Sequence, residues 1–341
     1  MPPSVESAIA RLAAVDESGL YSNFGPQEQH LRHRFAERFR VDASQVGTVA
    51  NATLGLSGSV TVLGGSRWAV PAFTFAATPA AVLAAGAEVI FADVGADLVL
   101  DAAGLSIDGW MPVAPFGERP DVNRWSALGR VVHDAAASIG NDLDLSCLPT
   151  GHAVVFSLHA TKVLGAGEGA VVVFGDEADA ARFRAWTNFG FSGSRNAEIV
   201  GANAKMSEIQ ACYVHAALDG WEQEQVEWVE ARERVERIAA AVGVKLLRFG
   251  NGVNPYAIAE FADAETALRV ESKLAEQGVG TRRWWSMGCH RMRAFAHLAD
   301  VAFPTADVIA GKTLGLPIFR GMSDKDAEAV RDALEEALSL G

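Results

Sequence analysis

The chain has 341 residues and is half apolar, which suits one large α/β domain with a smaller second domain. Its net charge of −13 argues against a nucleic-acid partner, because phosphate contacts need clustered Lys and Arg. The chain has neither a run of roughly 18 uncharged apolar residues for a membrane span nor a signal-peptide pattern, and three widely spaced cysteines without a CxxC pair favour a reducing, cytoplasmic location over a zinc module.

Short apolar segments alternate with helical patterns over the first 180 residues, after an amphipathic helix within residues 1–18. We expect helices at 76–85 and 122–128. The predicted strands are 67–70, 88–92, 110–114, 130–133, 153–157 and 170–174. Apolar strands separated by helices predict a largely parallel sheet covered on both faces, with the last two strands as neighbours.

A long helical pattern at 204–240 is predicted to lead into a C-terminal α+β unit. In that unit we expect strands at 254–261 and 314–318, and helices at 264–277 and 323–338. Ser323 suits the N-cap of the last helix, with Asp326 at its third position. We therefore predict a large domain over residues 1–240 and a small one over 241–341.

Two features of the large domain suit ligand binding, and each has a purely structural alternative. At 49–56 a small polar run precedes an apolar helical segment, so free N–H groups and a hydroxyl form a possible anion site. Capping by Thr53 or Asn51 is the commoner use of such a run. Asp134 follows an apolar strand, at the sheet edge where α/β proteins place ligands, or else caps the Ala-rich turn behind it.

Two further features lie in loops. Phe73 and Phe75 follow one strand, where aromatic rings pack into the core more often than they support a cofactor. Lys162 follows another strand in FSLHATK and precedes glycines that allow close backbone approach. A lysine desolvated beside a cofactor forms a Schiff base, whereas the alternative is an exposed turn lysine.

Together, these four features are the parts that pyridoxal phosphate requires. The phosphate needs an anion site, the ring needs a flat apolar neighbour, and the aldehyde needs a lysine. The pyridine nitrogen needs a carboxylate that keeps it protonated. The sequence therefore predicts a pyridoxal-phosphate enzyme.

The segments Phe156-Ser-Leu-His-Ala-Thr-Lys162 and Gly167-Glu-Gly169 are similar to the lysine motif of one enzyme family, the DegT/DnrJ/EryC1/StrS aminotransferases. Other matching segments follow in the same order: Gly25-Pro26, 71–75, 86–93, 134–136, 188–190, 201–211, Thr281-Arg282, Cys289-His290 and Leu316-Pro317. The resemblance covers nearly the whole chain. It implies an α/β, fold-type I pyridoxal-phosphate transferase, with a mostly parallel central sheet flanked by helices and a smaller C-terminal α+β domain.

The resemblance also implies roles for residues of the large domain. Lys162 would hold the cofactor as an internal aldimine, then move the proton between Cα and C4′ as base and acid. Asp134 would pair with the pyridinium nitrogen, and Phe75, rather than Phe73, would stack on the ring. The phosphate would be bound by Ser157 and by the turn of Ala52 and Thr53.

A third phosphate ligand, Asn203, would come from a neighbouring subunit, which implies a homodimer with shared active sites. One departure concerns Ala137, because the family usually has His or Gln at this position, near the phenolic oxygen of the cofactor. A methyl group donates no hydrogen bond, so water or another side chain must take that role, or the cofactor's electronics differ.

The substrate is predicted from segment 281–292, which combines cations and aromatic rings. Arg282 and His290 fall in family motifs and suit a nucleoside diphosphate, while Trp284 or Trp285 suits stacking on a base or sugar. The alternative is that the tryptophans pack the small domain and the arginines lie at its surface. Asn188 lies near the active site in relatives, although capping or turn formation explains it equally.

We therefore predict amino transfer, from L-glutamate, to a 3- or 4-keto-6-deoxy nucleoside-diphosphate sugar. The product would serve surface polysaccharide, such as O-antigen, or a glycosylated metabolite. The alternatives are a sugar dehydratase or a cyclitol aminotransferase of the same family, and a catalytically silent regulatory or binding protein. Dehydratases of the family replace the lysine with histidine, and Lys162 is retained here.

Overall fold

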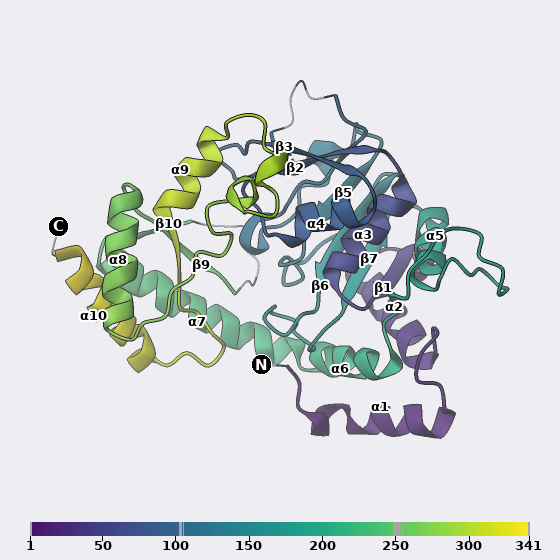
Figure 1. Cartoon of the computed structure of the whole chain (residues 1–341). Coiled ribbons are helices and arrows are strands. Elements are labelled where there is room, and N and C mark those ends of the chain that lie inside the picture. Colours follow the sequence, from purple (N-terminus) through teal and green to yellow (C-terminus); the bar gives the residue numbers. More distant parts are fainter. Residues whose placement is uncertain (1, 102–103, 105, 248–252, 254, 340–341) are drawn as a thin grey trace.

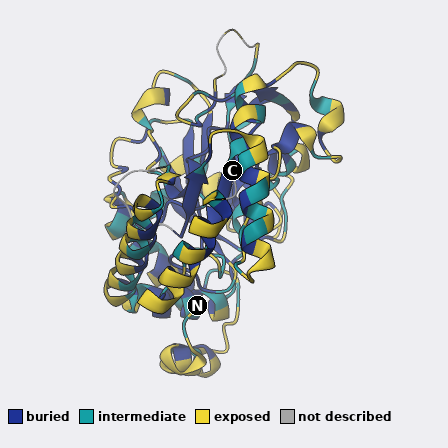
Figure 2. Cartoon of the chain, turned by 90° about the vertical axis from the view of Figure 1, so that its left-hand side faces the viewer, coloured by how far each residue is buried: buried dark blue, intermediate teal, exposed yellow. Residues whose placement is uncertain are grey.

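The computed structural model describes residues 2–339, apart from residues 102–103, 105, 248–252 and 254. In this part of the chain there are two β-sheets, of seven and three strands, with helices around them (Figure 1). Figure 2 shows buried strands enclosed by helices whose exposed faces point outward. None of the helices described is both long and apolar enough to cross a bilayer.

The large sheet runs in the order β1-β7-β6-β5-β4-β2-β3. Strands β6, β5, β4, β2 and β3 are parallel, whereas β7 is antiparallel to both of its neighbours. The strands are β1 Val46–Val49, β2 Arg67–Pro71, β3 Glu88–Ala92, β4 Gly109–Trp110, β5 Val131–Asp134, β6 His152–Ser157 and β7 Ala170–Phe174. The predicted α/β fold and the pairing of the strands at 153–157 and 170–174 are confirmed.

The strands of this sheet divide their apolar side chains between two layers of helices. In β6, Ala153 and Val155 face the core shared with α3 and α5, whereas Val154 and Phe156 face the core shared with α2 and α6. The helices of this part are α1 Val5–Ser18, α2 Pro26–Phe39, α3 Ala52–Leu63, α4 Ala77–Ala84, α5 Glu177–Thr187 and α6 Glu208–Asp219. Short 3-10 helices are η1 Ala43–Gln45, η2 Pro115–Gly117, η3 Asn123–Trp125, η4 Cys289–Arg291 and η5 Ala296–Leu298.

The small sheet is antiparallel, in the order β10-β9-β8, and has its own apolar core against α7, α8 and α10. Figure 1 shows α7 running from the large sheet to this C-terminal part. The elements are α7 Trp221–Ala241, β8 Lys245–Leu246, β9 Ala257–Glu260, α8 Ala264–Glu276, α9 Pro304–Lys312, β10 Thr313–Leu316 and α10 Asp324–Ser339. The domain boundary after residue 240 stays a prediction.

Two predicted elements of the large part are wrong in extent or type. The predicted helix at 122–128 is only the 3-10 turn η3, since the few residues between Pro120 and Gly129 do not sustain an α-helix. The predicted strand at 110–114 is only β4 Gly109–Trp110, because Pro112 has no N–H for the ladder. Pairing resumes at an isolated bridge between Val113 and Asp134.

The predicted helix at 204–240 is two helices, α6 and α7, which meet at Gly220. Helix α6 begins only after Ser207, which forms a capping box with Gln210. Farther on, the predicted helices at 264–277 and 323–338 are confirmed as α8 and α10, and Ser323 and Asp326 exchange hydrogen bonds as expected. The strands at 254–261 and 314–318 shorten to β9 and β10, and residue 254 lies outside the described residues.

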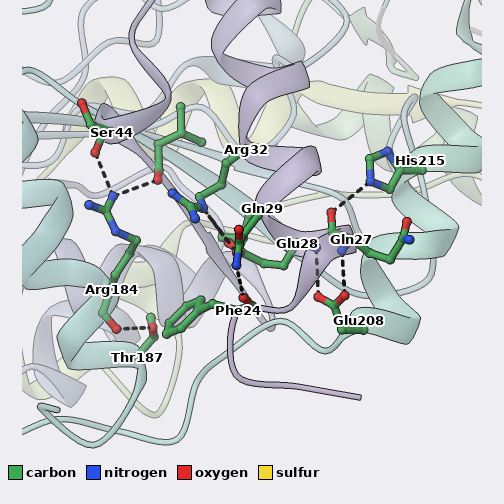
Figure 3. A network of polar contacts seen from close by, with 12 residues as sticks. Phe24, Gln27, Glu28, Gln29, Arg32, Ser44, Arg184, Thr187, Glu208 and His215 are labelled. Atoms are coloured by element: carbon green, nitrogen blue, oxygen red, sulfur yellow. Dashed lines mark hydrogen bonds and ion pairs between the residues drawn. The ribbon is translucent and has the colours of Figure 1, made fainter. Parts of the chain in front are cut away.

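Helix α6 is fixed to α2 through the carboxylate of Glu208 (Figure 3). Its oxygens accept the N–H groups of Gln27 and Glu28, at 2.7 and 2.9 Å, and thus satisfy the otherwise unpaired start of α2. A Cβ at Gly25 would lie 2.7 Å from the Glu208 Cδ, so a larger residue here would displace this carboxylate from its position at the start of α2. The family-like segments around 25–26 and 201–211 therefore meet in space.

Candidate active site

A cavity of about 690 Å³ lies at the carboxyl ends of β5 and β6, beside the first turn of α3. Carboxyl ends of parallel strands are the usual ligand position in α/β proteins. Most of the predicted site residues line this cavity: Ala52, Thr53, Phe75, Asp134, Ser157 and Lys162. The structure thus brings together segments that are far apart in sequence.

One end of the cavity is formed by the start of α3. The Asn51 side chain is the N-cap, accepting the Leu54 N–H at 3.0 Å. Ala52 and Thr53 begin the helix, where backbone N–H groups have no carbonyl partner within the helix and favour an anion. Ser157 lines the same cavity from the end of β6, and its Oγ accepts the His159 N–H at 3.2 Å. Capping and anion binding are therefore compatible here, and the phosphate roles stay predictions.

Asp134 ends β5 and is almost completely buried. Its carboxylate accepts the Thr78 hydroxyl at 2.7 Å and the Ala136 N–H at 3.2 Å. Burial raises the pKa of the Asp134 carboxyl, and these hydrogen bonds, with Lys162, only partly oppose that rise. A cation beside this carboxylate would offset the cost of its burial.

The two candidate aromatic rings differ clearly in their exposure. Phe73 is 2% exposed and packs against Trp285, with ring centroids 4.9 Å apart. Phe75 is 57% exposed and lines the cavity. A large exposed ring beside a cavity has a free face for a flat ligand. This placement suits the predicted stacking role of Phe75, which stays a prediction.

Lys162 follows β6 and reaches across the cavity to the C-terminal part of the chain. Its Nζ donates a hydrogen bond to the Tyr256 hydroxyl at 3.0 Å and lies 5.6 Å from the centroid of that ring. Lys162 is half-buried and lines the cavity, so it is not an exposed turn lysine. Tyr256 was not predicted, because no local sequence pattern connects it with residues near Lys162.

The rest of the cavity lining consists of aromatic rings and of small alanine side chains. Phe116, Trp284 and Trp285 line the cavity, and Phe116 stacks on Trp285 with centroids 4.1 Å apart. Phe116 has φ of 49°, an uncommon conformation for a residue with a side chain. Behind Asp134, the lining is Ala136 and Ala137, neither of which carries a side-chain donor.

Asn188 and Asn203 do not line the cavity of their own chain. They form an antiparallel bridge with each other, next to a segment with the exposed side chains of Phe189 and Val200. Asn203 is exposed, and its Oδ1 accepts a hydrogen bond from Lys205 at 2.9 Å. The predicted role of Asn203 at a neighbouring subunit and that of Asn188 near the active site stay predictions.

Arg282 and His290 also lie outside the main cavity. Arg282 lies over Trp284, 5.5 Å from its ring, beside a small neighbouring hollow. His290 is buried, with Nε2 2.8 Å from the Asp307 carboxylate and Nδ1 3.3 Å from the Ala72 carbonyl. In this chain His290 joins the loop after β2 to α9, and the substrate roles of both residues stay predictions.

The sequence model of the DegT/DnrJ/EryC1/StrS aminotransferase family matches residues 3–335. The chain is 28% identical to dTDP-3-amino-3,4,6-trideoxy-alpha-D-glucose transaminase of Streptomyces venezuelae over 348 residues, covering 96% of this chain and 91% of that protein. It is also 28% identical to dTDP-4-amino-4,6-dideoxy-D-glucose transaminase of Shigella dysenteriae over 226 residues, which are 62% of this chain and 61% of that enzyme.

Solved structures agree with this match. DesI, crystallised in the presence of its TDP-sugar product, is 30% identical with a TM-score of 0.86, over 98% of this chain and 91% of DesI. A Bacillus cereus ATCC 10987 protein, provisionally named a PLP-dependent aminotransferase, is 25% identical with a TM-score of 0.90, over 98% of this chain and 97% of that one. The chain therefore belongs to the DegT/DnrJ/EryC1/StrS aminotransferase family, and the predictions of an aminotransferase with pyridoxal phosphate as its cofactor are confirmed.

Proposed function

We propose that this chain moves an amino group from L-glutamate to a 3- or 4-keto-6-deoxy sugar of a nucleoside diphosphate, with Lys162 as the reactive residue. The observation that carries the proposal is that Lys162 and Asp134 line one cavity, into which the start of α3 also opens. The sugar substrate is supported by the relatives named as dTDP-sugar transaminases and by DesI with its TDP-sugar product.

The residues of the cavity fit pyridoxal phosphate. The start of α3 and Ser157 offer N–H and hydroxyl donors for the phosphate, and Phe75 offers an exposed ring face. The buried carboxylate of Asp134, which lacks a full counter-charge, suits the protonated ring nitrogen. When bound, the cofactor supplies an electron sink for the substrate carbon.

Each residue then has a separate task in the proposed reaction. Nζ of Lys162 would hold the cofactor at its aldehyde carbon and, when free, would carry a proton to and from the substrate carbon. Asp134 would keep the ring nitrogen protonated. Phe75 would fix the plane of the ring, and Trp284 and Trp285, which also line the cavity, would help to exclude water.

We further propose a homodimer in which Asn203 completes the phosphate site of the partner. Asn203 lies outside its own cavity and beside exposed apolar side chains at Phe189 and Val200, which are 46% and 92% exposed. A symmetric contact would cover these apolar groups and place two equivalent sites at the interface.

We also propose that the domain boundary follows residue 240. A cytoplasmic location is proposed as well, in keeping with the three free cysteines.

Peptide mapping tests the central assignment. After incubation with pyridoxal phosphate and reduction with borohydride, the cofactor mass should be found on the peptide that contains Lys162. Lys162→Ala should remove this label, while the control Lys273→Ala, at an exposed ion pair in α8, should retain it. Label on another lysine, or none, would contradict the assignment.

The same protein distinguishes the possible reactions. L-glutamate should abolish the visible absorbance of the loaded protein, and a keto-sugar nucleotide should restore it. Restoration by a keto-cyclitol alone would favour a cyclitol aminotransferase. No response to any amino donor, in protein labelled at Lys162, would favour a dehydratase or a silent relative.

A further inference from the structure

We propose that the Tyr256 hydroxyl hydrogen bonds the phenolic oxygen of the bound cofactor and thereby sets the proton affinity of the Lys162 linkage. This inference rests on the proposed function of Lys162. It assigns a role to a residue of the C-terminal part, directly before β9, in a site otherwise built by the large sheet.

The position of the Tyr256 hydroxyl is closely determined. Tyr256 is 9% exposed, and its oxygen lies 3.0 Å from the Lys162 Nζ. The ring packs edge-on against Trp284, with centroids 4.9 Å apart, and against Phe116 at 5.9 Å. A ring held on two sides by other rings has little freedom, so its hydroxyl stays at the lysine nitrogen.

The covalent structure of the cofactor places its phenolic oxygen close to the same atom. The oxygen is carried by the ring carbon next to the one that bears the aldehyde, and Lys162 binds the aldehyde carbon. A group in contact with Nζ is therefore within reach of the phenolic oxygen. Since a phenol hydroxyl both accepts and donates, Tyr256 accepts from the free lysine and donates to the cofactor once the lysine is bound.

Three other described residues of the cavity that carry donors, Thr53, Ser157 and His159, have different positions. Thr53 and Ser157 lie at the proposed phosphate site, and His159 is paired with Thr161 at 2.9 Å. Next to Asp134, the lining side chains are the methyl groups of Ala136 and Ala137. The hydroxyl in contact with the Lys162 Nζ is that of Tyr256, whose oxygen accepts the hydrogen bond in this structure.

The proposed hydrogen bond from Tyr256 shifts the proton equilibrium of the linkage between Lys162 and the cofactor, which can be measured. A donor at the phenolic oxygen stabilises its negative charge and favours loss of the proton that this oxygen shares with the Lys162 nitrogen. A hydrogen bond to a charged group contributes about 1.5 to 3 kcal/mol, which corresponds to a shift of about one to two pH units. The ionisable groups that line the cavity are Asp134, His159, Lys162, Glu168 and Tyr256.

The test is a pH titration of the visible absorbance of protein loaded with pyridoxal phosphate. Tyr256→Phe, which keeps the ring, should raise the midpoint by about one to two pH units. Adding Ala137→Gln to Tyr256→Phe should bring the midpoint back toward the original value, because a new donor then lines the same cavity. Tyr213→Phe, in α6 and away from the cavity, serves as the control and should leave the midpoint unchanged.

The outcomes separate this inference from the proposed function. If Lys162 carries the borohydride label in every variant but the Tyr256→Phe midpoint equals the original, the inference is overturned and the proposed function stands. A lower thermal stability of Tyr256→Phe with an unchanged midpoint shows a packing role only and also overturns it. If the unaltered protein shows no label at Lys162, the proposed function fails first.

Discussion

His133 carries an energetic cost that depends on pH. It lies in β5 beside Asp134, is 2% exposed, and its Nε2 has no hydrogen-bond partner among the described residues. Its ring lies 5.7 Å from that of His152. Burial, with a smaller contribution from His152, lowers the pKa of His133 from 6.5 to about 3.

The sign of the effect follows from the depressed pKa. The folded chain favours neutral His133, whereas the unfolded chain protonates it below pH 6.5. The stability that depends on neutral His133 is therefore fully present above pH 6.5, and the free energy of unfolding declines as the pH falls toward about 3. With these two pKa values, protonation of His133 in the unfolded chain lowers the free energy of unfolding by about 2 kcal/mol at pH 5. In His133→Phe, the free energy of unfolding should therefore fall by about 2 kcal/mol less between pH 7 and pH 5 than in the original protein.

Urea unfolding of the cofactor-free protein, followed by circular dichroism at one protein concentration, measures this difference. Burial raises the pKa values of Glu28 and Asp134, and these carboxyls act in the opposite direction as the pH falls. The two proteins must therefore be compared at each pH, with His297→Asn at an exposed site as a control. If His133→Phe loses as much stability as the original protein over this range, the linkage argument is wrong.

Three further predictions concern the site and its support. Asp134→Asn should lower the turnover rate about 10- to 100-fold, because an amide cannot counter the charge of a protonated ring nitrogen, and unchanged rates would refute that pairing. Asn203→Ala should speed the loss of cofactor on dialysis without changing the fold of the subunit that carries it. A protein that sediments as a monomer and is active in that state would contradict the shared site. Gly25→Ala should destabilise the fold by about 1 to 3 kcal/mol through its clash with Glu208, as measured by urea unfolding. Since Glu208→Ala also removes the cap of α2, the comparison is made within that background, where adding Gly25→Ala should cost much less; an equal cost would contradict the clash.

The sequence predicts best what a single strand and its end determine. Ser157 and Lys162 come from one strand end, and Asp134 from the end of the neighbouring strand, so apolar runs that predict the strands also predict where these residues meet. Parallel strands place their carboxyl ends at one sheet edge. The same logic fails at 110–114, where Pro112 ends the regular pairing inside an apolar run.

What the sequence did not predict depends on contacts between distant segments. Tyr256 meets Lys162 across 94 positions of chain, and its hydroxyl belongs to no local motif. Glu208 caps a helix about 180 positions earlier, although in the sequence it looks like an ordinary first-turn acid of α6. The role of Asn203 at a neighbouring subunit is expected only from the family resemblance, and it stays a prediction.

The large sheet and the C-terminal part of the chain share an apolar core and meet at Lys162, and this arrangement divides the work of the site. The groups that suit the cofactor lie on the large sheet and α3, whereas Trp284 and Trp285 belong to the segment before α9. Changes in this segment should therefore affect the choice of sugar more than the retention of cofactor. Tyr256 is the exception, since it comes from the C-terminal part but contacts the lysine itself. Any shift of the small sheet relative to the large one would move this hydroxyl from Nζ, so the position of the C-terminal part and the proton affinity at Lys162 are coupled through one contact.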